Sequence, residues 1–149
     1  MKIIFACIIA CTSYLASAQL TELNTIVDQW HLDATNAHFE NYFEIMTKNF
    51  VFLGTAPEER WSKEEFSGFC KPYFDEGKAW SFVASKRNWI FSKNKKMAWF
   101  DEDLDTWMQG CRGSGIMIKE RGKWKLAYYN LTVLIENEKI QEFIELRER

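Results

Sequence analysis

The sequence predicts one α+β domain in which helices gather on one face of a curved antiparallel sheet. Two observations carry this prediction. The first half of the chain holds two amphipathic helical patterns with one short strand pattern between them, and the second half holds four runs that alternate polar and apolar residues. The connections between these runs are short, and short connections join antiparallel neighbours. Aromatic residues form 16% of the chain, which indicates a large rigid core or an aromatic cavity.

The first eighteen residues resemble a secretion leader. Lys2 gives a positive start, the apolar run after it is too short to span a bilayer, and Ala16-Ser17-Ala18 is a small-residue cleavage site. A lipoprotein anchor would need a cysteine directly after that site, where Gln19 stands instead. We therefore expect a signal peptide over 1–18, a single domain over 19–149 with no membrane span, and export to a periplasm or to the outside.

Charge and metal-ligating residues exclude several classes of function. The chain carries a formal net charge of −2, and without a basic stripe it is not expected to bind nucleic acid. His31 and His38 are seven residues apart, outside the usual spacing of a metal pair, so we expect no metal and no cofactor. Outside the leader, Cys70 and Cys111 can form one disulfide or remain two buried thiols, and the sequence leaves both open.

The first helix is expected over residues 21–47, with Thr21 as its cap. Its apolar stripe recurs at spacings of three, four and eight residues. The stripe consists of Leu23, Val27, Trp30, Ala34, Ala37 and Ile45. The alternating, branched and aromatic stretch "NFVFLGT" then predicts a short strand that ends at Gly54.

A second helix is expected to begin at Ser62. Glu65 stands three residues later, as a capping box requires. Pro72 is expected to disturb the last turn and Gly77 to end the helix. The residues expected to face inward are Phe66, Phe69 and Phe74.

The rest of the chain predicts a four-strand meander and a closing amphipathic helix. Ser92-Lys93-Asn94 and Arg121-Gly122 supply the clearest turns. The closing helix is expected over 137–147, with apolar Ile140, Phe143 and Ile144. The four strand patterns cover residues 79–92, 95–103, 107–120 and 123–135.

Several segments in order resemble the SnoaL-like branch of the nuclear transport factor 2-like superfamily. They are "DQWHLDATNAHFENYFEIMTKNFVFLGT", "ERWSKEEF", "KPYFDEGKAW", "AWFDE", "CRGSG" and "GKWKLAYYNLTVLIENE". The resemblance implies a cone: a curved antiparallel sheet of about four to six strands wrapped around N-terminal helices, with a cavity at its open end. Members include ketosteroid isomerases, scytalone dehydratase and polyketide cyclases, so the fold alone names no activity. Ala56 stands where such relatives often carry an acid, which weakens a catalytic role for that loop.

Charged residues within the meander mark a candidate site. Arg112 shares a face with Ser114, Ile116 and Ile118, while Lys119 lies on the other face, which must reach solvent. We therefore expect Arg112 to face the concave side beside Trp99. A buried guanidinium needs a carboxylate, and Asp101 is the first candidate partner and Glu102 the second. The pair would either brace two strands or aim the guanidinium at a ligand oxygen.

Other side chains join this candidate site by position. Alternation in the last strand places Tyr128 and Asn130 inside. Trp61, at a strand-to-helix junction, forms a wall of the cavity or packs on the start of the helix. His31 and His38 can supply a base near pH 7 or lie at a surface edge of their helix.

Three functions fit these observations. The first is an exported domain that binds a small apolar or acidic molecule, and that forms a homodimer through its convex sheet face. The second is an isomerase, cyclase or dehydratase, in which an acid or a histidine moves a proton while Tyr128, Asn130 or Arg112 stabilises an oxyanion. The third is an interaction module whose own tryptophans fill the cavity.

Overall fold

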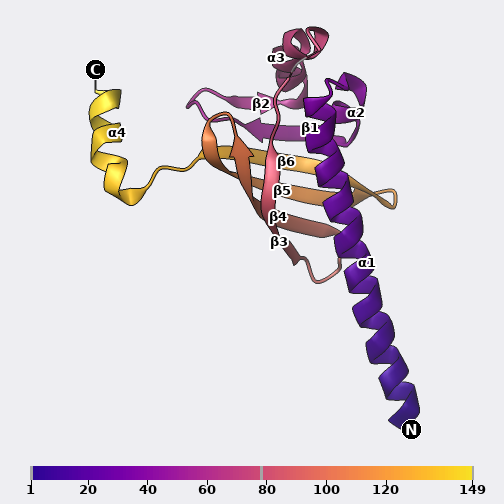
Figure 1. Ribbon diagram of the computed structural model, residues 1–149. Coiled ribbons are helices and arrows are strands. Elements are labelled where there is room, and N and C mark those ends of the chain that lie inside the picture. The colour runs from indigo at the N-terminus through magenta and orange to yellow at the C-terminus, as the bar shows by residue number, and fades with distance from the viewer. Residues whose placement is uncertain (1, 78, 149) are drawn as a thin grey trace.

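The computed structural model describes residues 2–77 and 79–148, with side chains described from Ser17 onward (Figure 1). It confirms the α+β class and the predicted order of helix, strand, helix and meander. The elements in order are α1 (Lys2–Thr35), α2 (Phe39–Glu44), β1 (Met46–Leu53), β2 (Arg60–Ser62), α3 (Lys63–Asp75), β3 (Val83–Phe91), β4 (Met97–Thr106), β5 (Gln109–Glu120), β6 (Lys123–Val133), the 3₁₀ turn η1 (Asn137–Lys139) and α4 (Ile140–Arg147).

The six strands form one curved sheet in the order β2-β1-β6-β5-β4-β3, and α1 crosses one of its faces (Figure 1). The prediction of a wholly antiparallel sheet is wrong at one position, because β1 pairs with β6 in parallel. β2 was not predicted. It has three residues, which is too short for alternation to give a signal.

The predicted helix over 21–47 is two helices. α1 ends at Thr35, where Ala37 N donates to Ala34 O at 3.1 Å and His38 N donates to Asp33 O at 2.8 Å. These two bonds form a Schellman motif, with Ala37 at φ 55° in the position that usually holds glycine. An alanine there gives no stop signal in the sequence. Thr21 is not a cap, because it lies inside α1 and its hydroxyl donates to Ser17 O at 3.1 Å.

α3 begins as predicted. Ser62 and Glu65 form the capping box, and Gly77 adopts φ +73° after the helix ends. Pro72 lies within α3. Phe69 corrects the expected packing, since its side chain is 41% exposed while Phe66 and Phe74 are buried as predicted.

The concave face of the meander is opposite to the one predicted from Arg112. On β4 the buried residues are Ala98, Phe100, Glu102 and Leu104, and on β5 they are Cys111, Gly113, Gly115 and Met117. Arg112 therefore lies on the outer face. The prediction failed because that outer face is also apolar: Ile90, Trp99, Ile116 and Tyr128 are successive register partners across four strands.

A β-bulge in β6 reverses the predicted orientation of Tyr128 and Asn130. Ile116 pairs with Tyr128 and Met117 pairs with Leu126, so the register passes over Ala127. Trp124 and Leu126 point inward before the bulge, and Tyr129 and Leu131 point inward after it. The extra residue shifts the period-two alternation by one position.

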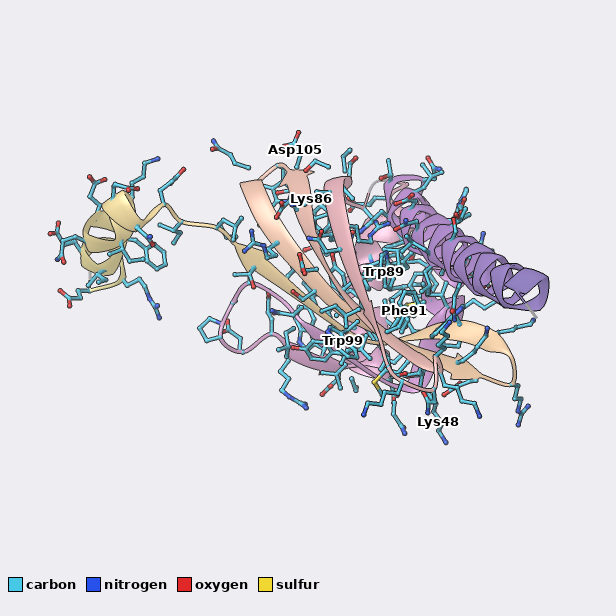
Figure 2. All side chains as sticks on the ribbon, turned by 90° about the horizontal axis from the view of Figure 1, so that it is seen from below. Lys48, Lys86, Trp89, Phe91, Trp99 and Asp105 are labelled. Carbon is cyan, nitrogen blue, oxygen red and sulfur yellow. The ribbon has the colours of Figure 1, made fainter. Side chains whose placement is uncertain are left out.

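Edge strand β3 also contributes side chains to the interior. Figure 2 shows Trp89 and Phe91 on the side of the sheet that faces α1. The indole Nε1 of Trp89 donates to Asn24 Oδ1 of α1 at 2.8 Å. This bond holds the strand edge against the helix.

The remaining features concern the termini and the thiols. The helix predicted at the C-terminus is present as η1 and α4, and α4 lies apart from the sheet (Figure 1). Cys70 and Cys111 are both buried free thiols, not a disulfide.

Among the described residues, no helix has the length and apolar character needed to cross a membrane. The leader over 1–18 stays a prediction, as does its cleavage.

Candidate functional site

An aromatic-lined cavity of about 170 Å³ lies between the helices and the concave face of the sheet. A dry cavity of about 150 Å³ in another protein holds one benzene ring, so this space can hold a ring or a head group of similar size. The aromatic residues that line it are Trp30, Tyr42, Phe52, Trp61, Phe66, Phe69, Trp80, Phe82, Trp107 and Tyr129.

The floor of the cavity is polar. His31 of α1 and Tyr129 of β6 line it, at 6% and 1% exposure, and both bind the same oxygen of Glu102 on β4. His31 Nε2 lies 2.8 Å from Glu102 Oε1, and the Tyr129 hydroxyl donates to that oxygen at 2.7 Å. Glu102 itself is fully buried behind these two side chains.

Arg87 of β3 neutralises the buried carboxylate. Its Nε donates to Glu102 Oε2 at 2.8 Å, and Nη2 lies 2.7 Å from the same oxygen without a well-aligned hydrogen bond. Nη1 lies 2.8 Å from the carboxylate of Asp28 and donates to Asn24 Oδ1 at 3.3 Å. The guanidinium is thus held between α1 and the sheet, and its charge is matched by two carboxylates.

These contacts fix the protonation of the floor. Burial on its own would raise the pKa of Glu102, but the hydrogen bond and charge of His31, the charge of Arg87 and the hydroxyl of Tyr129 together lower that pKa. Burial raises the pKa of Tyr129 well above its ordinary value, and the neighbouring Glu102 carboxylate raises it further. Glu102 is therefore an acceptor and Tyr129 a neutral donor. It follows that Nε2 of His31 carries the hydrogen in its bond to Glu102.

Two glycines of the "CRGSG" segment make room for this arrangement. A Cβ on Gly113 would lie 2.0 Å from the Tyr129 hydroxyl oxygen and 3.0 Å from Glu102 Cγ. A Cβ on Gly115 would lie 2.4 Å from the ring of Phe100. The glycines thus serve close packing on the concave face of β5.

The mouth of the cavity is formed by the residues that both line it and reach solvent. Trp107, in the β4–β5 turn, is 80% exposed. Glu59, in the loop between β1 and β2, also lines the cavity, and its Oε2 accepts from Ala56 N at 3.1 Å. This loop therefore supplies a carboxylate to the cavity from Glu59, although Ala56 carries none.

Of the predicted site residues, Trp61 lines the cavity and Glu102 lies directly behind its floor. Arg112 does neither, since its side chain is 50% exposed and its Nη2 lies 3.1 Å from Asp103 Oδ1. The expected pairing of Arg112 with Asp101 or Glu102 is wrong, because Arg112 lies on the outer face and its register partner on β4 is Asp103.

The outer face holds the other predicted site residues as well. Trp99 is 41% exposed there, and Asp101 accepts from Asn88 Nδ2 at 2.9 Å. Tyr128 and Asn130 follow the bulge onto the same face. None of these four residues lines the aromatic cavity.

The two histidines lie in different surroundings. His31 belongs to the cavity floor, whereas His38 is more than half exposed and its Nδ1 lies 3.2 Å from Asp33 Oδ1. Within residues 17–77 and 79–148, whose side chains the structure describes, no three His, Cys, Asp or Glu side chains gather as a metal site would require.

The sequence did not identify Arg87, Tyr129 or Trp107 as site residues. Arg87 stands in the polar run "SKRN", which resembles an exposed edge. Tyr129 was placed outside by the alternation that the bulge interrupts. Glu102 shares parity with Ala98, Phe100 and Leu104, but the opposite parity includes Met97 and Trp99, so alternation alone did not place Glu102 inside.

Comparison with known proteins gives one family and many similar folds. The family model of the SnoaL-like domain matches residues 23–136. No curated protein matches the sequence.

Among solved structures, similarity is high in fold and low in sequence. An NTF2-like protein of unknown function from Pseudomonas putida KT2440 has a TM-score of 0.68 at 10% identity, over 83% of this chain and 92% of that chain. A proposed scytalone dehydratase from Novosphingobium aromaticivorans DSM 12444 has a TM-score of 0.66 at 11% identity, over 80% and 87%. A proposed ketosteroid isomerase from Parabacteroides distasonis ATCC 8503 has a TM-score of 0.61 at 10% identity, over 75% and 85%.

Proposed function

The chain belongs to the SnoaL-like domain family, and we propose that its aromatic cavity binds one small, mostly apolar molecule whose polar end contacts His31 and Tyr129. The observation that carries this proposal is the polar floor beneath an aromatic wall. A cavity with a few convergent polar groups is the common form of a small-molecule site. The prediction of an acidic ligand depended on Arg112 facing the cavity. It is not retained, because the guanidinium lies on the outer face.

Thermal unfolding of residues 19–149 at increasing concentrations of phenol or toluene tests this proposal. Both probes are expected to raise the unfolding temperature, and Leu131→Phe, which fills space in the cavity lining, is expected to abolish the effect. Val133→Phe is the matched control, because Val133 lies on the same strand but is exposed. No stabilisation by either probe, or stabilisation that survives Leu131→Phe, would overturn the proposal.

A second candidate function is proton transfer within the same cavity. Glu102 holds the Nε2 hydrogen of His31, and among the described residues His31 Nδ1 has no hydrogen-bond partner. When the imidazole of His31 is neutral and its hydrogen lies on Nε2, Nδ1 is the nitrogen that can accept a proton. His31 would then take a proton from the carbon beside a ligand carbonyl and return it, while Glu102 stabilises the imidazolium.

Hydrogen–deuterium exchange of cyclohexanone in D₂O, followed by proton NMR, tests this second function. The wild type is expected to accelerate exchange beside the carbonyl, and His31→Phe is expected to remove the acceleration. Equal exchange rates with the wild type and with His31→Phe would contradict proton transfer by His31 and would leave binding as the proposed function.

Export and self-association complete the proposal. The apolar row Ile90, Trp99, Ile116 and Tyr128 on the outer sheet face supports a homodimer through that face, since two of its members are 55% and 41% exposed. Export through the proposed leader over 1–18 predicts cleavage after Ala18. N-terminal sequencing of the protein recovered from an exporting host should begin at Gln19 and would argue against export if it began at Met1.

A further inference from the structure

We infer that the ligand of the cavity is a small organic cation, whose charged head lies at the mouth between Glu59 and the ring of Trp107. This inference rests on the proposed function and adds the charge of the ligand to it. It concerns the mouth of the cavity and does not depend on what His31 does at the floor.

The loop between β1 and β2 is built around the Glu59 carboxylate. Glu59 Oε2 accepts from Ala56 N at 3.1 Å, and Gly54 N donates to Glu59 O at 2.8 Å. A Cβ on Gly54 would lie 2.1 Å from Glu59 Oε2, so the glycine leaves the space that the carboxylate occupies. The position of this charge is therefore fixed by the backbone of the loop.

This carboxylate has no cation of its own. Across the described part of the chain, no lysine, arginine or histidine forms an ion pair with Glu59. The cavity lining described by the structure includes no lysine or arginine. An unpaired carboxylate beside an aromatic cavity attracts a cationic ligand and repels an acidic one.

The aromatic residues at the mouth would also attract the positive charge of such a ligand. Trp107 lines the cavity, is 80% exposed and, among the described side chains, forms no pair with another ring. Trp61 and Phe69 also line the cavity and stack on each other with centroids 4.5 Å apart. Aromatic rings attract cations through their quadrupoles, and sites for quaternary ammonium groups combine several such rings.

Size and polarity narrow the class further. A cavity of about 170 Å³ has room for a trimethylammonium head with a short chain. The hydroxyl or carbonyl end of such a molecule would meet His31 and Tyr129 at the floor. The inferred ligand class is therefore an amino alcohol or a similar small ammonium compound.

The test compares choline with 3,3-dimethylbutan-1-ol, which has the same shape but a carbon atom in place of the charged nitrogen. Binding to residues 19–149 is followed through the tryptophan indole signals in ¹H–¹⁵N spectra. Choline is expected to bind about tenfold more tightly than the neutral alcohol. Glu59→Gln, which can keep the bond from Ala56 N, is expected to abolish that preference.

Glu58→Gln is the matched control, because Glu58 is the adjacent exposed carboxylate and does not line the cavity. Trp107→Leu provides an independent variant at an exposed position and should also weaken choline binding. Equal or tighter binding of the neutral alcohol would overturn the inference. Binding of phenol without any binding of choline would overturn it as well and leave the proposed function standing, whereas no binding of any probe would overturn both.

Discussion

Gly113 of β5 leaves the space in which the Tyr129 hydroxyl meets Glu102, since a Cβ at residue 113 would lie 2.0 Å from that hydroxyl oxygen. The hydroxyl donates to Glu102 Oε1 at 2.7 Å. The polar floor of the cavity thus depends on Gly113, although this residue has no side chain and its strand β5 contributes no polar group to the floor.

Gly113→Ala is expected to destabilise the protein by about 2–4 kcal/mol, because it both overpacks the core and displaces a buried hydrogen bond. Urea unfolding of the variant measures this change. Gly110→Ala on the same strand is the control, since a Cβ there would meet nothing within 4 Å. Equal stability of the two variants would contradict the packing role of Gly113.

The two arginines of the meander are expected to differ strongly in their effect on stability. Arg87→Met leaves the buried Glu102 without its cation and should cost about 3–5 kcal/mol. Arg112→Met breaks an exposed pair with Asp103 and should cost less than about 1 kcal/mol. Chemical denaturation of both variants decides this, and a larger loss for Arg112→Met would reverse the assignment of the two faces.

Lowering the pH should remove the contribution of the Glu102 carboxylate to the free energy of unfolding. Its pKa is lowered in the folded protein, so its contribution to stability is complete above the ordinary carboxyl value of about 4.3 and is lost as pH falls through the lower folded value. The difference in unfolding free energy between the wild type and Glu102→Gln should therefore shrink as the pH falls below about 4. A constant difference from pH 7 to pH 3 would contradict this linkage.

The two cysteines are expected to stay reduced and unreactive in the native protein. Burial raises the pKa of the Cys70 thiol, which leaves almost no thiolate at pH 8, and Cys111 is buried too. A thiol reagent should therefore modify neither cysteine in native residues 19–149 and both in guanidinium. Failure to label them after unfolding without reductant would reveal a disulfide.

The outer apolar row gives a direct test of self-association. Trp99→Lys places a charge in the middle of Ile90, Ile116 and Tyr128, and should convert the proposed homodimer to a monomer. Size-exclusion chromatography with light scattering measures the mass of each form. Asp101→Lys on the same strand and face is the control. A wild type that is already monomeric would rule out the dimer.

The sequence was sufficient for the fold and insufficient for the site, and particular residues show why. The Ser62–Glu65 capping box and Gly77 are local signals with local outcomes, and both were predicted correctly. The orientation of Tyr129 depends on one bulge at Ala127, which no local pattern announces. The burial of Arg87 depends on Glu102 and Asp28, which lie far from it in the sequence.

Period-two reasoning also fails when both faces of a sheet are apolar. Trp99 and Ile116 on the outside are as hydrophobic as Phe100 and Met117 on the inside, so alternation alone could not choose the concave face. The glycines at 113 and 115 indicate the correct face, but only when their neighbours across the sheet are known.

The location of a bound probe tests the central claim most directly. Intermolecular NOEs between phenol and the protein, measured at saturation, are predicted to reach the side chains of Trp61 and Leu131, which line the cavity. NOEs confined to Trp99 and Ile116 would place the binding surface on the outer sheet face and would contradict a ligand site above His31 and Tyr129.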